Sequence, residues 1–220
     1  MIRILFTAGL VLASISIAVA ADPVEFHIGY LHRIEHKEAI SLLDMPAADD
    51  GLAGARLGIE DNNTTGKFLN QHFDLQELRL SGKDDPGVAA ADLARQHVSF
   101  VLADLPADAL LAAADAGRDR GPLWFNVGAT DERLREQDCR ADVIHVAPTR
   151  SMLADGLAQY LVWKQWRRWL LVVGSHDNDK LYADALRRAA GRFGAKVVQE
   201  RLFEDPGGAR RTDKIGRAHV

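Results

Sequence analysis

Short apolar runs alternate with amphipathic helical segments along most of this chain, and this alternation limits the folds open to it. The runs typical of strands are 25–31, 73–80, 98–105, 122–130 and 142–148. Apolar residues at helical spacing fill the segments between them, among them 52–63, 87–96 and 107–117. Strands that alternate with helices in this way form parallel sheets with helices on both faces. The sequence therefore predicts a doubly wound α/β fold.

A second unit of the same kind begins after Pro148. Residues 149–166 have helical spacing, with Thr149 or Ser151 as the N-cap, and a strand–helix–strand pattern follows over 167–203. We expect two lobes, 21–148 and a partial lobe 149–213, joined by a tight hinge. The apolar face expected on the first helix of the second lobe is made of Leu153, Leu157, Tyr160 and Leu161, and is continued by Trp163, Trp166 and Trp169.

Residues 1–20 have the composition of an export signal. Arg3 gives a positive start, Ile4 to Val19 is apolar, and Ala18-Val19-Ala20 has the small side chains that a signal peptidase accepts. The run is short for a membrane span, and no basic stop-transfer flank follows it. We expect a cleaved signal peptide, a mature protein that begins at Ala21, and a periplasmic location.

Charge and motif content argue against several classes of function. The formal net charge is −4 with a pI near 6.1, so no basic surplus indicates a nucleic-acid partner. Neither a P-loop nor a G-x-G-x-x-G motif follows any expected strand, and we predict no cofactor. One cysteine, Cys139, cannot form an internal disulfide, and we interpret it as a loop thiol.

The loop Ser175-His176-Asp177 contains the residue types of a catalytic triad. Adjacent residues cannot place nucleophile, base and orienting carboxylate in one hydrogen-bonded line. The chain also has no G-x-S-x-G nucleophile elbow. We therefore predict that the protein is not an enzyme.

His32 and His36 have the i, i+4 spacing of zinc ligands, with His27 nearby. The segment has no H-E-x-x-H motif, and His27 falls within an expected strand. We interpret these histidines as solvated side chains, and predict no metal site.

Four stretches of the chain share a more specific pattern. They are “GARLGIEDNNTTGKFL” (54–69), “NVGATDERL” (126–134), “HVAPTRSMLADGLAQYL” (145–161) and “VVGSHDNDKLYADALRRAAGRFGAKVV” (172–198). Together, within residues 26–203, they resemble the type I periplasmic solute-binding proteins of ABC importers, the Leu/Ile/Val-binding-like family. The resemblance is greatest to the binding proteins that accompany PQQ-dependent alcohol oxidation systems.

The resemblance implies a fold and a function. The fold would be two α/β lobes joined by a hinge, with a small polar solute held between them and the closed form recognised by a membrane permease with its ATPase. It also implies a monomer without catalytic activity. The alternatives are an exported ligand-sensing domain of a signalling receptor and, third, an α/β enzyme.

Candidate ligand-binding residues in the first lobe come from two sources. Gly128 and Thr130 match the family's loop after the fourth strand, whose backbone amide and hydroxyl hold a ligand carboxylate. Tyr30 and His32 follow the first strand, at the edge where α/β sheets bind ligands. Where amino-acid binders carry a serine after the third strand, this chain has Leu105 and no hydroxyl, which argues against an α-amino acid as the solute.

The candidates in the second lobe lie in the loop after its first strand. Tyr182 matches the tyrosine of the family's His-Asp-x-x-x-Tyr-Gly loop, although Ala183 replaces the glycine and the loop is one residue longer. Ser175 and His176 begin this loop and complete the predicted ligand-binding set.

The end of the chain also differs from what precedes it. Residues 214–220 show no periodicity, and residues 215–220 look like a translated sequencing adapter. The second lobe also has only about two strands and two helices. We expect a C-terminally truncated fragment with a non-native tail.

Overall fold

The computed structural model describes residues 22–33, 47, 49–118 and 121–203. The predicted signal peptide, His36 and the predicted tail lie outside the described residues. No helix within those described ranges is both long and apolar enough to span a membrane.

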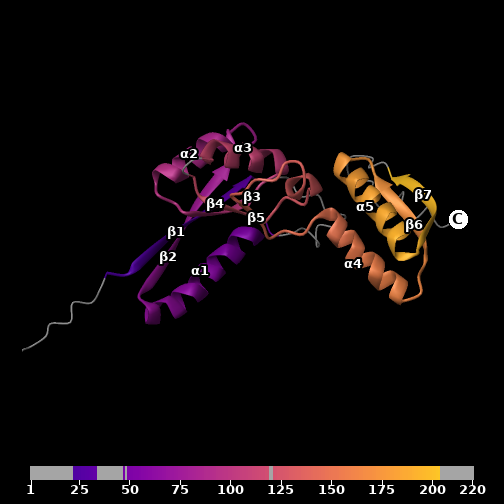
Figure 1. The fold of residues 1–220 in the computed structure, drawn as a ribbon, viewed down its shortest axis with the longest axis horizontal. Helices are drawn as coiled ribbons and strands as arrows, with labels where there is room; N and C mark the ends of the chain where they lie inside the picture. The colour runs from indigo at the N-terminus through magenta and orange to yellow at the C-terminus, as the bar shows by residue number, and fades with distance from the viewer. Residues whose placement is uncertain (1–21, 34–46, 48, 119–120, 204–220) are drawn as a thin grey trace, which may run out of the picture.

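Five parallel strands form the larger sheet (Figure 1). Their order is β2-β1-β3-β4-β5, and all their carboxyl ends lie along one edge. The chain forms these strands where the sequence predicts them, because β3, β4 and β5 lie in short apolar runs, whereas β2 alternates apolar and polar residues. Their bounds are β1 (Val24–Arg33), β2 (Gln71–Leu80), β3 (Phe100–Asp104), β4 (Leu123–Asn126) and β5 (Val143–His145).

Helices cover both faces of this sheet. Helix α1 (Asp50–Leu69) lies on one face, and α2 (Pro86–Arg95) and α3 (Ala107–Gly117) lie on the other (Figure 1). Asp85 caps α2, because its side chain accepts a hydrogen bond of 2.8 Å from the Gly87 amide. The largest fully buried side chains of this core are Leu31, Leu93, Val101, Leu110, Trp124 and Leu134. We refer to these elements, residues 22–147, as the first lobe.

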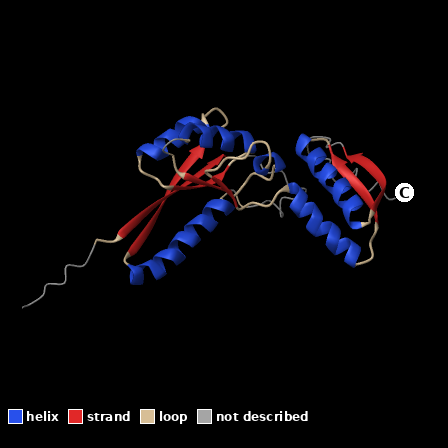
Figure 2. Cartoon of the chain, in the orientation of Figure 1, coloured by secondary structure: helices blue, strands red, loops and turns tan. Residues whose placement is uncertain are grey.

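The second lobe contains a two-stranded parallel sheet and two helices (Figure 2). It consists of α4 (Arg150–Trp163), β6 (Arg168–Gly174), α5 (Asp177–Phe193) and β7 (Lys196–Phe203). Thr149 is the N-cap of α4, since its hydroxyl accepts a hydrogen bond of 3.2 Å from the Met152 amide. The predicted α/β fold with parallel sheets is therefore confirmed.

The prediction that the large apolar side chains of α4 form its buried face is wrong. Helices α4 and α5 pack through four alanines, and the larger side chains of α4 point away from that contact. Trp163 is 70% exposed and Trp166 is 61% exposed, whereas Trp169 does pack on the small core. The alanines that make the contact are Ala154, Ala158, Ala185 and Ala189. Small side chains let two helices approach closely, so they rather than the large residues define the buried side.

Candidate functional site

Tyr30 and Asp104 meet at the carboxyl edge of the larger sheet. They lie on the adjacent strands β1 and β3, and the Tyr30 hydroxyl donates a hydrogen bond of 2.9 Å to Asp104 Oδ2. Tyr30 is 2% exposed. Burial, followed by the hydrogen bond to Asp104 and the charge of that carboxylate, raises the pKa of Tyr30 well above its ordinary value. The phenol therefore stays protonated and acts as a donor to Asp104.

A cavity of about 760 Å³ lies between this edge and α1. Its polar part contains the carboxyl groups of Asp50 and Asp104, the Tyr30 side chain and Asn62. Apolar walls are formed by Ile28, Ile59, Leu102 and Val127, and the face that α1 presents is made of Gly51, Gly54, Ala55 and Gly58. Cavities of this size with few polar groups are typical of small-molecule sites.

Gly128 packs directly against Asp104. A Cβ atom at position 128 would lie 2.5 Å from Asp104 Oδ1 and 3.2 Å from the Leu105 nitrogen. Asn126 is fully buried and holds this loop through two hydrogen bonds. Its side-chain amide donates to the Ala129 carbonyl at 2.8 Å, and its Oδ1 accepts from the Ala129 amide at 2.9 Å. Only glycine therefore lets the loop after β4 approach the end of β3 so closely.

His32 lies on the same strand as Tyr30, but it does not line the cavity. Its Nε2 is 3.2 Å from Glu77 Oε1 on β2, and its ring centre is 5.1 Å from that of Tyr30. Glu77 also pairs with Arg56 of α1 at 3.2 Å. His32 thus borders Tyr30 on the β2 side, two strands away from Gly128 and Thr130.

Ser175 and His176 lie at the end of β6 and are exposed. The His176 backbone amide donates 3.1 Å to Asp179 Oδ2, which closes the loop at the start of α5. The His176 side chain also lies 3.3 Å from Asp179 Oδ2, so it is paired at the start of α5. Within the described ranges, no three His, Cys, Asp or Glu side chains are grouped so that they could hold a metal ion.

Arg150, at the start of α4, links the loops of the two lobes. Its Nη1 lies 3.0 Å from Asp131 Oδ2, while Nε and Nη2 donate 3.0 and 2.9 Å to Asn178 Oδ1. The guanidinium carbon also lies 5.7 Å from the centre of the Tyr182 ring. Arg150 is only 8% exposed. It therefore brings the predicted residue Tyr182 of α5 next to the loop that follows β4.

The backbone around Arg150 is held as well. The Arg150 amide donates 2.9 Å to the Thr130 carbonyl, and the Ser151 amide donates 2.8 Å to Glu132 Oε1. Glu132 belongs to the short 3₁₀ helix η2 (Glu132–Arg135). Burial tends to raise the pKa of Glu132, but hydrogen bonds from its own backbone and from Ser151, together with nearby Arg150, outweigh it and lower that pKa.

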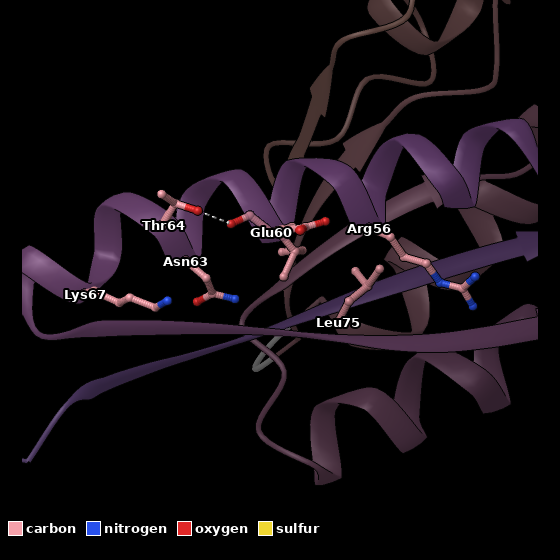
Figure 3. A pocket seen from close by; sticks show the side chains of 7 residues that line it. Arg56, Glu60, Asn63, Thr64, Lys67 and Leu75 are labelled. Atoms are coloured by element: carbon pink, nitrogen blue, oxygen red, sulfur yellow. Dashed lines mark hydrogen bonds between the residues drawn. The ribbon is translucent and has the colours of Figure 1, made fainter.

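A second cavity, of about 430 Å³, lies between α1 and β2 (Figure 3). Its wall contains both cationic and polar side chains, and Thr64 donates 3.1 Å to the Glu60 carbonyl within α1. None of the predicted ligand-binding residues line it. The residues that do are Arg56, Ile59, Glu60, Asn63, Thr64, Lys67 and Leu75.

The predicted residues thus fall into two groups and three outliers. Tyr30 and Gly128 meet at Asp104, and Thr130 and Tyr182 meet at Arg150. The outliers are His32, which contacts Glu77, His176, which contacts Asp179, and Ser175, which is exposed at the end of β6. Sequence reasoning missed Asp104, Asp131, Arg150 and Asn178. An available signal was position, since Asp104 lies next to the end of the predicted strand 98–105, Arg150 at the start of the predicted helix 149–166, and Asn178 in the predicted loop after the first strand of the second lobe.

The chain forms two α/β lobes joined by a short connecting segment, and loops at strand ends of both lobes lie at the junction. This arrangement is typical of two-lobed ligand-binding proteins. The profile of the periplasmic binding protein family matches residues 45–209, and the chain belongs to this family. No curated protein matches the chain.

Solved structures of type I periplasmic binding proteins share the fold. A branched-chain amino acid ABC transporter periplasmic ligand-binding protein from Burkholderia xenovorans is 18% identical, with a TM-score of 0.66 over 87% of this chain and 50% of its own. An ABC transporter substrate-binding protein from Desulfitobacterium hafniense is 17% identical, with a TM-score of 0.63 over 88% and 55%. A periplasmic binding protein type 1 from Bordetella pertussis is 15% identical, with a TM-score of 0.54 over 90% and 54%. The chain spans about half the length of these structures.

Proposed function

We propose that this protein is the solute-binding component of an ABC importer. It captures a small polar solute between its lobes in the periplasm and presents it to a membrane permease with its ATPase, without catalysing a reaction on it. The family and its solved relatives are binding proteins rather than enzymes, which supports this proposal.

The observation that carries the proposal is the meeting of two strand-end loops at Arg150. Residues 128–131 follow β4 of the first lobe and residues 175–178 follow β6 of the second, and Arg150 contacts Asp131 and Asn178 at once. In open α/β folds, ligands bind at the carboxyl ends of strands. A solute there contacts both lobes and can favour their closure.

The solute that we propose is small and polar, held by Tyr30, Gly128, Thr130, Ser175, His176 and Tyr182, with His32 at the margin. One relative is titled as a branched-chain amino acid transporter protein. The absence of a hydroxyl at Leu105 still argues against an α-amino acid for this chain. We propose instead a solute of a PQQ-dependent alcohol oxidation system, such as an alcohol or its acid.

A panel of solutes tests the proposal. Thermal unfolding and titration calorimetry are run with amino acids, short alcohols, diols and the matching carboxylic acids. We expect saturable binding of one class of solute without turnover, and stimulation of ATP hydrolysis when the loaded protein is added to its cognate permease–ATPase complex. Chemical conversion of any bound compound, or saturable binding of none, would contradict the proposal.

The proposal also includes the processing of the chain and its oligomeric state. We propose that the leader is removed after Ala20 and that the mature protein is a monomer with lobes 21–148 and 149–213. N-terminal sequencing of periplasmic material should begin at Ala21, and light scattering should give the monomer mass. Material that begins at Met1 would contradict the processing.

A further inference from the structure

We propose that Arg150 is a positioning residue that favours one spacing of the two lobes in the absence of solute and aims the 175–178 loop at the 128–131 loop. This inference deepens the proposed function, and only its consequence for solute binding rests on that function. The spacing itself can be measured without any ligand.

The geometry of the guanidinium suits this role. Its planar fork has five N–H groups, and three of its nitrogens are used here in two directions. Nη1 faces Asp131 of the first lobe, whereas Nε and Nη2 both donate to Asn178 Oδ1 at the start of α5. The ring of Tyr182, one helical turn further along α5, covers the guanidinium at 5.7 Å. One side chain is thus in contact with both lobes.

Other contacts near the junction join α5 to α4 or join the first turn of α4 to the first lobe. Arg188 of α5 donates 2.6 Å to Asp155 Oδ1 and 3.1 Å to the Ser151 carbonyl, so it joins α5 to α4 within the second lobe. The hydrogen bonds to Thr130 and Glu132 attach the first turn of α4 to the first lobe. Those contacts join α5 to α4 and α4 to the first lobe, whereas the Arg150 side chain contacts Asp131 and the start of α5 at once.

Burial makes this contact resist separation. An arginine that is 8% exposed has lost most of its water, and a buried charge without partners is costly. If the lobes moved apart at this point, either Asp131 or Asn178 would leave the guanidinium. Separation of the two loops therefore requires Arg150 to lose its contact with Asp131 or with Asn178. The cost of that loss restricts the range of spacings between the lobes.

Interlobe distances provide the test. In the whole chain with Cys139→Ser, spin labels are placed at Ala91→Cys on α2 and Lys196→Cys on β7, both exposed positions. Distances are measured by pulsed electron resonance without solute. We expect Arg150→Met to give a distribution about twice as broad as the parent, because two partners are lost at once. Arg150→Lys, which keeps the charge near Asp131 but not the fork to Asn178, should restore part of the narrow distribution.

Matched controls separate positioning from stability. Arg188→Met removes a comparable arginine from within the second lobe and should leave the interlobe distribution unchanged. Asp131→Ala and Asn178→Ala keep Arg150 and remove one partner each, so both variants should broaden the interlobe distribution even if Arg150→Met does not fold. Distributions as narrow as the parent in both partner variants would overturn the inference. Failure of every solute in the panel, with these distributions broadened, would count against the proposed function alone.

Discussion

The Arg150 guanidinium lies 3.0 Å from the Asp131 carboxylate, where the chain passes from the first lobe into α4. This ion pair is largely shielded, with 9% of the Arg150 side chain and 24% of the Asp131 side chain exposed. Breaking such a pair by removing one partner costs more than its formation contributes, because the remaining charge stays desolvated. The pair therefore gives the junction a preferred geometry.

The Tyr30 hydroxyl should contribute measurably to stability. Tyr30→Phe removes the donor to Asp104 while keeping the buried ring, so we expect the free energy of unfolding to fall by about 1–2 kcal/mol. Denaturant titration at pH 7 measures it. A change near zero would mean that Asp104 finds an equivalent donor.

High pH offers a second readout on the same pair. The pKa of Tyr30 is raised in the folded state, so the stabilisation that it gives is complete below the ordinary tyrosine pKa of about 10 and is lost as pH rises beyond that value. The parent should therefore lose stability more steeply above about pH 10 than Tyr30→Phe does. Parallel curves for the two proteins would contradict this assignment.

Gly128→Ala should disturb the carboxyl end of β3. The added Cβ would meet Asp104 Oδ1 at 2.5 Å, so the loop or the carboxylate must move, at a cost of about 1–3 kcal/mol. Gly156→Ala on α4 is the matched control, since nothing lies within 4 Å of its Cβ position. The control should be neutral or stabilising by up to about 1 kcal/mol. Equal effects of the two changes on the unfolding midpoint would show that Gly128 is not tightly packed.

Tyr182→Ala should weaken solute binding with little loss of stability. Tyr182 is half-buried beside Arg150 at the junction, whereas Tyr160 of α4 is 51% exposed and lies away from it. Thermal shift with the solute panel compares Tyr182→Ala with Tyr160→Ala. If the two variants and the parent respond alike to the true solute, Tyr182 is not in the site.

The strands could be predicted from short apolar runs and, for β2, from the alternation of apolar and polar residues. The expected strand 73–80 differs from β2 only at its start, and the expected helix 87–96 is shifted by one residue from α2. The buried face of α4 could not be predicted by size, because Ala154 and Ala158 pack against other alanines and leave Tyr160 outside. Which face of a helix is covered depends on its neighbour.

The site could be predicted only in part, for a similar reason. Strand ends identified Tyr30 and the 175–176 loop as candidates, since parallel strands share a carboxyl edge. Arg150 acquires its role from Asp131 and Asn178, which are distant in the sequence and approach it only once both lobes have folded. A charged residue that begins a helix looks the same in sequence whether it is solvated or buried.

Replacing a leucine by alanine should destabilise the larger sheet much more than the smaller one. Leu31 on β1 is fully buried, and Leu31→Ala should lower the free energy of unfolding by about 2–5 kcal/mol. Leu170 on β6 is 58% exposed, and Leu170→Ala should change it by no more than about 0.5 kcal/mol. Denaturant midpoints measure both. A large cost for Leu170→Ala would show that this face of β6 is covered in solution.

Asp115 should make the protein sensitive to acid in a defined range. Arg140 donates from Nε and Nη2 to both of its carboxylate oxygens, at 2.7 and 3.0 Å, and with Arg118 lowers the pKa of Asp115 to about 2. Because the folded pKa lies below the unfolded one, the stabilisation is present above about pH 4 and is lost as pH falls towards about 2. The group is partly exposed, so Asp115→Asn should cost no more than about 1 kcal/mol at pH 7. The difference from the parent should shrink below pH 4 and also in about 1 M salt. A difference that stays constant from pH 7 to pH 2 would show that Asp115 acts through packing rather than through its charge.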